Sequence, residues 1–152
     1  MAEEIERKFL LKKDYWPHEN VVKYRQGYLN SDEKKTVRVR TAGDKGYLTI
    51  KGASIGASRL EFEYEIPLQD AGILLDLCEK PLIEKNRYKV VDGDFIWEID
   101  EFFGENSGLI IAEIELEHEN QEFKKPDWIG EEVTGDPRYY NASLIKNPYK
   151  NW

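Results

Sequence analysis

Charged and apolar residues alternate along this chain of 152 residues in one predicted β-strand after another. In residues 4–8, Glu4, Glu6 and Lys8 share one face of a strand, because successive side chains point to opposite faces. Ile5 and Arg7 lie on the other face. A single strand of this kind is compatible with a sheet that has one solvated face. The recurrence of the pattern, with charges of both signs in order, favours a barrel lined with charge.

Alternation and turn signals predict eight β-strands. They span residues 3–11, 21–29, 35–41, 47–51, 59–66, 82–91, 95–103 and 109–117. The predicted turns lie at residues 30–32, 42–46 and 92–93, and residues 14–20 are expected to form a loop. Short connections favour antiparallel pairing, and eight strands can close into a small barrel without exposed edges. We therefore predict one domain over residues 1–152, α+β but mainly β: a closed eight-stranded antiparallel β-barrel with a few flanking helices.

Helices are predicted in three places. Residues 68–79 have apolar positions at helical spacing. This stripe consists of Ile73, Leu74, Leu77 and Cys78. Residues 120–124 are a candidate short helix, and Asp136 with Pro137 is typical of the start of a last helix. The last helix would close one mouth of the barrel or pack on its wall, and Trp97 would pack outside the barrel under a helix.

Acidic residues gather on the first, fifth, seventh and eighth predicted strands. Carboxylate oxygens are the ligands that Mg²⁺ and Mn²⁺ prefer, and a bound metal would offset the crowding of like charges. Like charges opposite one another destabilise an ordinary solvated sheet, which weakens that simpler interpretation. The inward acids are Glu4, Glu6, Glu61, Glu63, Glu98, Asp100, Glu113 and Glu115.

Basic residues gather on the third, fourth and sixth predicted strands. Arginine offers bidentate hydrogen bonds to phosphate and lysine a point charge, so such a wall could hold a small polyanion. The inward bases are Arg38, Arg40, Lys51, Lys85 and Arg87, with Lys8 from the first strand.

The net charge of −8 argues against a general nucleic-acid binder, but it does not exclude a small anionic substrate. Cys78 is the single cysteine, so no internal disulfide can form, which fits a reducing compartment. The chain shows no secretory signal pattern and no apolar run long enough to span a membrane. We expect a cytoplasmic protein; the sequence allows a homodimer through the barrel exterior but does not determine the oligomeric state.

Residues 4–8 fit the ExExK signature of the CYTH domain, also called the triphosphate tunnel metalloenzyme superfamily. Further motifs follow in the family's order. They are Arg25-Gln26-Gly27-Tyr28, Arg38-Val39-Arg40, Thr49-Ile50-Lys51, Glu61-Phe62-Glu63, Glu84-Lys85-Asn86-Arg87-Tyr88, Glu98-Ile99-Asp100 and Glu113-Ile114-Glu115. The whole chain resembles the small bacterial inorganic triphosphatases of this family.

The resemblance implies an eight-stranded tunnel that hydrolyses tripolyphosphate to pyrophosphate and phosphate with Mg²⁺ or Mn²⁺. The six inward bases would bind phosphates and the inward acids would surround the metals, with Glu98 and Asp100 assigned to the same acidic wall. Lys8 would orient the terminal phosphate or the water, together with Tyr28, so both are candidate catalytic residues.

Other functions stay open at this stage. A class IV adenylyl cyclase would need a pocket for adenine and ribose, and a thiamine triphosphatase would need apolar residues at the tunnel mouth, where Trp128 could serve. A nucleoside triphosphatase and a non-catalytic polyphosphate-binding module are further alternatives. An RNA triphosphatase is disfavoured because the negative net charge opposes binding of an RNA chain.

Overall fold

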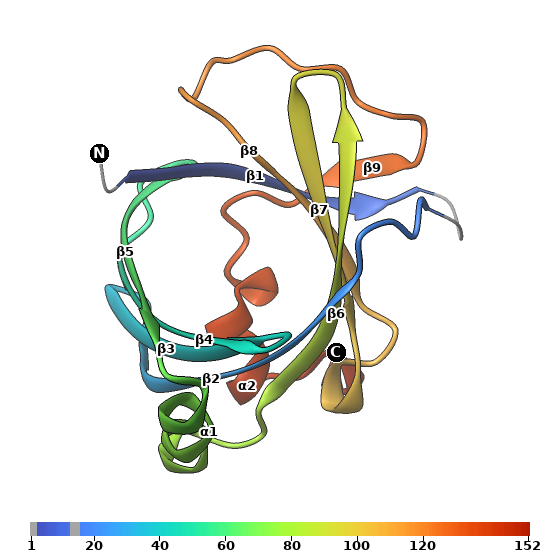
Figure 1. Ribbon diagram of the computed structural model, residues 1–152. Helices are drawn as coiled ribbons and strands as arrows, with labels where there is room; N and C mark the ends of the chain where they lie inside the picture. Colours follow the sequence, from blue (N-terminus) through green and yellow to red (C-terminus); the bar gives the residue numbers. More distant parts are fainter. Residues whose placement is uncertain (1–2, 13–15) are drawn as a thin grey trace.

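The computed structural model describes residues 3–12 and 16–152. Eight strands close into an antiparallel barrel in the order β5-β4-β3-β2-β6-β7-β8-β1, and β1 pairs back with β5 (Figure 1). The strands are β1 (Glu3–Leu11), β2 (Val22–Asp32), β3 (Lys35–Ala42), β4 (Lys45–Gly52), β5 (Ser58–Ile66), β6 (Ile83–Asp92), β7 (Phe95–Phe102) and β8 (Ile110–Glu115). The predicted closed eight-stranded barrel is confirmed. Residues 14 and 15 of the predicted loop lie outside the described residues.

Strand β1 closes the barrel because its two ends have different partners along one edge. Its first residues pair with β5, with Glu4 opposite Arg59, while Glu6 faces Glu115 of β8 on the other edge. The edge of β1 that pairs with β5 continues past it, and its later residues pair with a short strand, β9 (Ile129–Glu132). The sequence analysis did not predict this strand. The residues of the ExExK signature therefore lie at the seam of the barrel.

The predicted turn at residues 30–32 is wrong, because β2 continues through Asp32 and the chain turns at Glu33 and Lys34. A register shift between Tyr28 and Asn30 marks a bulge in the pairing of β2 with β3. An extra residue accommodated in this way lets a strand extend past a polar stretch that resembles a turn in sequence.

Helix α1 (Leu68–Leu77) lies against the outside of β3 and β4 and is shorter than predicted. Its buried side is formed by Ala71 and Leu75, with Cys78 just after the helix, packed on Val39. Ile73 and Leu77 are 58% and 71% exposed, so that half of the predicted apolar stripe is wrong. Helix α1 turns Ala71 toward the barrel because the helix lies very close to β4 at Gly46. A Cβ on Gly46 would lie 2.7 Å from the Cβ of Ala71.

Residues 120–124 form no helix, and Trp97 is covered by this irregular segment and not by a helix. The rings of Phe123 and Trp128 make edge contacts with the Trp97 ring at 5.9 and 5.8 Å. Trp97 is fully buried in the largest apolar cluster, which includes Phe9 and Ile114. The burial of these apolar side chains holds the segment against the barrel.

The C-terminal part begins at the predicted position but as a 3₁₀-helix, η2 (Pro137–Tyr139), capped by the Asp136 side chain. Helix α2 (Asn141–Lys146) follows, and η3 (Tyr149–Asn151) comes after it. A further 3₁₀ turn, η1 (Gly104–Asn106), joins β7 to β8. Through the ring of strands in Figure 1, α2 and the segment before it lie across the far end of the barrel.

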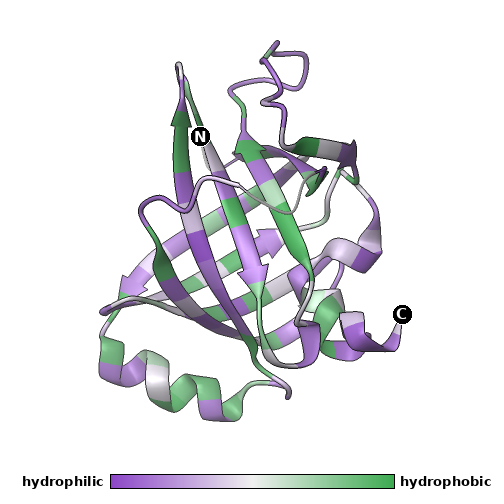
Figure 2. Cartoon of the chain, turned by 90° about the vertical axis from the view of Figure 1, so that its right-hand side faces the viewer, coloured by the Kyte–Doolittle hydropathy of each residue, from purple (hydrophilic) through white to green (hydrophobic). Residues whose placement is uncertain are grey.

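The apolar clusters lie between the outer face of the barrel and the segments that cover it. The strands in Figure 2 are banded in alternating hydrophilic and hydrophobic colours, as the period of two requires. The polar residues of the strands line the interior of the barrel. Over the described ranges, no helix has the length and apolar character needed to cross a membrane.

Candidate active site: a charged tunnel

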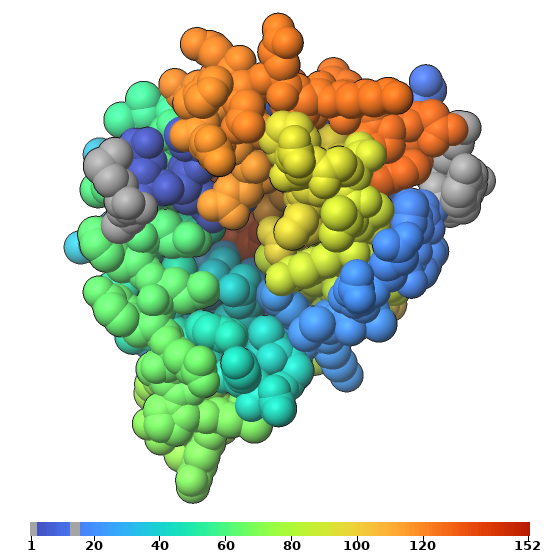
Figure 3. Space-filling view, turned by 45° about the horizontal axis from the view of Figure 1, so that its top comes forward, coloured from blue at the N-terminus to red at the C-terminus, as the bar shows by residue number. Residues whose placement is uncertain are grey.

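A cavity of about 480 Å³ occupies the inside of the barrel. Figure 3 shows its opening as a hollow with the C-terminal segment at the bottom. Every predicted site residue lines the cavity except Asp100. The lining set is Glu4, Glu6, Lys8, Tyr28, Arg38, Arg40, Lys51, Glu61, Glu63, Lys85, Arg87, Glu98, Glu113 and Glu115.

The strand order places the charges of each sign on one continuous wall. Strands β4, β3, β2 and β6 are neighbours, and β4, β3 and β6 carry the inward bases. Strands β7, β8, β1 and β5 are also neighbours and carry the inward acids. Lys8 of β1 and Arg59 of β5 are exceptions, because these two bases line the cavity from the acidic wall. The two walls meet where β5 adjoins β4 and where β6 adjoins β7.

Carboxylates crowd one another on the acidic wall. Glu6 lies opposite Glu115, and Glu98 opposite Glu113, in adjacent strands. Burial, followed by the charge of Glu6, raises the pKa of Glu113 above its ordinary value. Burial and the charge of Glu4 do the same to the pKa of Glu115. These groups are therefore ionised at a free-energy cost that a nearby cation would reduce.

Glu63 of β5 lies beside two guanidinium groups of the basic wall. Its Oε1 lies 2.9 Å from Arg40 Nη2 and 3.5 Å from Arg38 Nη2, and Thr49 Oγ1 donates to it at 3.0 Å. Burial, and then the charges of Arg38 and Arg87, lower the pKa of Arg40 to about 10. The Nε atoms of both arginines are buried without a hydrogen-bond partner within the described part of the chain. Each guanidinium therefore keeps an unused donor.

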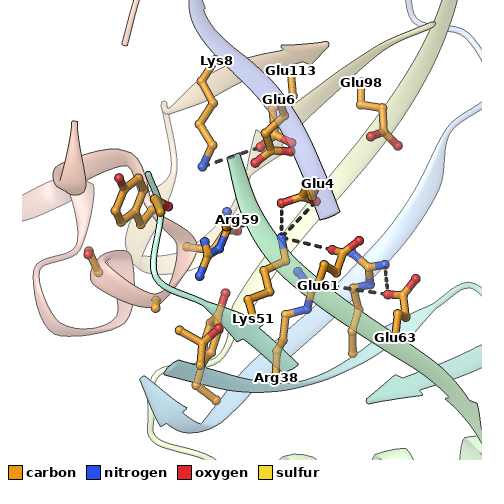
Figure 4. A pocket seen from close by; sticks show the side chains of 18 of the residues that line it. Glu4, Glu6, Lys8, Arg38, Lys51, Arg59, Glu61, Glu63, Glu98 and Glu113 are labelled. Atoms are coloured by element: carbon orange, nitrogen blue, oxygen red, sulfur yellow. Dashed lines mark hydrogen bonds and ion pairs between the residues drawn. The ribbon is translucent and has the colours of Figure 1, made fainter. Parts of the chain in front are cut away.

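Lys51 connects the two walls at the seam. Its ammonium lies 3.0 Å from Glu4 Oε1 and 3.3 Å from Glu61 Oε2, as the dashed lines in Figure 4 show. Burial opposes its charge, but Glu6 and Glu4 raise the pKa of Lys51. Burial raises the pKa of Glu4, while Lys51 acts in the opposite direction.

Asp100 lies on β7 beside Arg87 of β6 and does not line the cavity. It is 1% exposed, and its carboxylate accepts hydrogen bonds from Lys85 Nζ at 2.8 Å and from Arg87 Nε at 2.7 Å. These two cations hold its pKa below the ordinary range in spite of burial. Burial, and then the charge of Arg87, lower the pKa of Lys85 to about 8, although Asp100 opposes this. Asp100 thus orients two phosphate-binding candidates.

The C-terminal segment, residues 137–143, lines one end of the cavity and closes it. Of the two roles predicted for the last helix, it therefore closes a mouth of the barrel. Asn141 Oδ1 accepts hydrogen bonds from Gln26 Nε2 and from Lys85 Nζ, each at 3.1 Å. The ammonium of Lys8 lies 5.2 Å from the centroid of the Tyr140 ring. The segment therefore contacts one lysine on each wall.

The carboxylates fit a divalent metal in their chemistry but are not gathered around a point. Among the described residues, no three acidic, histidine or cysteine side chains stand together in an arrangement that would hold a metal ion. Several carboxylates nevertheless face one cavity, where burial and neighbouring carboxylates raise the pKa values of Glu113 and Glu115. Hard cations such as Mg²⁺ and Mn²⁺ take such oxygen ligands.

Several lining residues were missed by the sequence analysis. Arg59 lines the cavity, is fixed by a 3.1 Å hydrogen bond from its Nε to Gly52 O, and is labelled in Figure 4. It shares the inward face of β5 with Glu61, so the period of two could have found it. Tyr24 and Tyr47 also line the cavity, but aromatic residues in a strand gave no sign of a site. Asn141 reaches it from a distant segment, which no local pattern indicates.

Trp128 does not lie at the mouth of the tunnel, so that expectation is wrong. It is buried in the apolar cluster against Trp97 outside the barrel. Trp128 therefore provides no apolar surface for thiamine at the mouth of the tunnel.

A closed antiparallel barrel with opposed acidic and basic walls defines a class of protein, the tunnels that hold a polyanion together with cations. The chain belongs to the CYTH domain family, whose model matches residues 2–149. The resemblance inferred from the motifs is thereby confirmed, and membership of this family of tunnel metalloenzymes implies a divalent metal.

Two relatives match over nearly their whole length. An inorganic triphosphatase of Acetivibrio thermocellus is 62% identical over 154 residues, covering 100% of this chain and 99% of the relative. An inorganic triphosphatase of Nitrosomonas europaea is 38% identical over 146 residues, covering 93% and 95%. The crystal structure of an inorganic triphosphatase has a TM-score of 0.69 at 35% identity, covering 95% of this chain and 95% of the other.

Proposed function

We propose that the protein is an inorganic triphosphatase that hydrolyses tripolyphosphate to pyrophosphate and phosphate inside the barrel. The observation that carries this proposal is the facing of an acidic and a basic wall across one cavity. A binding module for polyphosphate needs the bases alone. The relatives named above, at 62% and 38% identity, support the same activity.

The basic wall would bind the phosphate groups. Arg38 and Arg40 each keep a buried unpaired Nε, which suits donation to phosphate oxygens. Lys85 and Arg87 are held in place by hydrogen bonds to Asp100 on the neighbouring strand, so their remaining donors are oriented before the substrate arrives. Lys51 would add positive charge at the seam. Charge stabilisation by such preorganised donors favours the transfer of a phosphoryl group.

The acidic wall would hold Mg²⁺ or Mn²⁺ through carboxylate oxygens. The proposed ligand set is Glu4, Glu6, Glu61, Glu63, Glu98, Glu113 and Glu115. When bound, the metal would supply neutralisation of phosphate charge and a lowered pKa for bound water.

Water would attack the terminal phosphorus while the bridging P–O bond breaks and pyrophosphate leaves. The water proton would pass to a carboxylate of the acidic wall, and no protein nucleophile is required. Lys8 stands on this wall, with its ammonium 3.9 Å from Glu113 Oε1, and would orient the terminal phosphate or the water. Tyr28 lines the same cavity and would assist it.

The test is phosphate release from tripolyphosphate, ATP and thiamine triphosphate, each with Mg²⁺, Mn²⁺ or EDTA, with nucleotide products separated by chromatography. Metal-dependent release from tripolyphosphate, with slow turnover of ATP, is the expected result. Formation of cyclic AMP would assign the protein to the cyclases. Tight binding of tripolyphosphate without turnover would leave a non-catalytic binding module and overturn the proposal.

We place this activity in the cytoplasm because the single cysteine, Cys78, is free and buried against α1, as in a protein that needs no disulfide. The homodimer stays a prediction. Size-exclusion chromatography with light scattering would decide it.

A further inference from the structure

Tyr24 occupies the middle of the basic wall without carrying a charge. Strand β2 lies between β3 and β6, which supply Arg40 and Arg87, and Tyr24 pairs in register with Lys85 of β6. The Tyr24 side chain lines the cavity and is 7% exposed. An aromatic ring therefore separates basic residues that the neighbouring strands would otherwise bring together.

The ring is in contact with three cations. Its centroid lies 4.8 Å from Arg40 Cζ, 5.0 Å from Arg87 Cζ and 5.9 Å from Lys85 Nζ. All three distances lie within the range in which the negative face of an aromatic ring attracts a cation. Such attraction is stronger at desolvated sites than at exposed ones, and Tyr24 is only 7% exposed.

Like charges act on Arg40 within the basic wall. Arg40 lies 2.9 Å from a carboxylate oxygen of Glu63, and its Nε has no hydrogen-bond partner within the described ranges. The pKa of Arg40 is lowered first by burial and then by the charges of Arg38 and Arg87, so neighbouring arginines add to the cost of keeping it charged. The ring of Tyr47, at 5.7 Å, is a second and more distant aromatic contact of the same guanidinium.

We propose that Tyr24 is a positioning residue, whose ring face holds Arg40, Arg87 and Lys85 at the spacing required to bind a chain of phosphates. The inference rests on the proposed function for its substrate, tripolyphosphate. The simpler alternative is that Tyr24 only fills space between the walls. An aliphatic side chain of similar size would fill that space without attracting cations, so the two explanations predict different outcomes for substitution.

The experiment compares Tyr24→Leu with Tyr24→Phe in the full chain. Tyr24→Leu should raise KM for tripolyphosphate about tenfold and change kcat by less than about threefold, since phosphate binding weakens while the acidic wall is untouched. Tyr24→Phe keeps the ring and should restore KM to within about twofold of the original value. Tyr47→Leu should have a smaller effect than Tyr24→Leu, because its ring contacts Arg40 at the longer distance.

A binding measurement keeps this inference separate from the proposed activity. Calorimetric titration with pyrophosphate and Mg²⁺ requires no turnover, and Tyr24→Leu should raise the Kd about tenfold. If the unmodified protein binds pyrophosphate but does not hydrolyse tripolyphosphate, the proposed function falls while the role of Tyr24 is still measured. The matched control is Tyr64→Leu, because Tyr64 is 57% exposed on the outside of β5.

A double-mutant cycle tests whether Tyr24 acts through the cations. In an Arg87→Ala background, Tyr24→Leu should raise the Kd by only about threefold, because one of its cation contacts is already gone. The proposal is overturned if Tyr24→Leu binds pyrophosphate like the original protein. It is equally overturned if Tyr24→Phe loses as much affinity as Tyr24→Leu, or if Tyr24→Leu lowers only Tm.

Discussion

The ammonium of Lys51 lies 3.0 Å from the carboxylate of Glu4, although the two residues are 47 positions apart in the chain. The pair forms where the first strand closes the barrel against β5, and Glu61 is a second carboxylate within 3.3 Å of the same ammonium. A positive charge from the basic wall is thus built into the acidic wall at the seam.

Removing that charge should make the fold depend more on a divalent cation. Lys51→Met leaves Glu4 and Glu61 without their shared partner, so we expect Tm to fall in EDTA. Mg²⁺ or Mn²⁺ can replace the lost positive charge, so the rise in Tm on adding metal should be larger in the variant than in the original protein. Thermal unfolding with and without metal measures this. An equal rise in both proteins would contradict a metal site near Glu4 and Glu61.

Substitution on the acidic wall should weaken the response to metal. Glu6→Gln and Glu115→Gln each remove one ionised oxygen ligand, and we expect about a tenfold increase in the metal concentration for half-maximal activity. Titrations of tripolyphosphate hydrolysis with Mg²⁺ and with Mn²⁺ would measure it. Glu65→Gln is the control, since Glu65 is an exposed residue at the far end of β5. An unchanged metal response in both wall variants would count against the proposed ligands.

Metal binding should stabilise the protein more at neutral than at acid pH. The pKa values of Glu4, Glu113 and Glu115 are raised in the fold above the ordinary 4.5. Such groups favour the folded state below pH 4.5, and that contribution is lost as the pH rises through 4.5 and then through the folded pKa. A cation offsets the charge that then develops, whereas protons compete with it in acid.

The increase in Tm caused by Mg²⁺ or Mn²⁺ should therefore be larger at about pH 7.5 than at about pH 5. Differential scanning fluorimetry at matched ionic strength would measure both increases. An increase that does not change with pH would show that these carboxylates do not bind the metal.

Asp100 should contribute to stability and not to metal binding. Asp100→Asn leaves Lys85 and Arg87 buried without their shared counter-charge, so we expect a loss of about 3–5 kcal/mol in the free energy of unfolding. Denaturant unfolding measures this loss. The metal concentration for half-maximal activity should stay within about twofold for the folded variant. A tenfold change in that concentration would place Asp100 among the metal ligands after all.

Lys8 should matter for the chemical step more than for binding. Lys8→Ala removes the ammonium that lies on the acidic wall beside Glu113, and we expect kcat for tripolyphosphate to fall by about a hundredfold or more. The Kd for pyrophosphate should change much less. Steady-state kinetics combined with calorimetric titration separates the two quantities, and full kcat in the variant would dismiss Lys8 from the chemistry.

The period of two carried most of the site prediction. It assigned the inward faces of seven strands, and the cavity is lined by the residues it selected. Asp100 has the same alternation but sits too deep in the wall to line the cavity, because Lys85 and Arg87 occupy both of its oxygens. Alternation along a strand predicts which face of the sheet a side chain is on, but not how deeply that side chain is buried.

Local sequence patterns did not predict the aromatic residues of the site or the contacts of the C-terminal segment. Tyr24 and Tyr47 were not selected because an aromatic residue in a strand is most often ordinary packing. Strand β9 was not predicted because its four residues form a strand only by pairing with the free edge of β1. Helix α2 begins near the predicted cap, but its contact with Gln26 and Lys85 depends on the whole barrel being closed.

The sequence by itself determined which residues face inward and that the strands number eight in the barrel, because alternation along a strand is a local property of the backbone. Only the tertiary structure decided which strands are neighbours and therefore that the acids form one wall and the bases another. It also decided that α2 closes one end and that Tyr24 lies among three cations. Those relationships join segments far apart in the chain, and they exist only once β1 has paired with both β5 and β8.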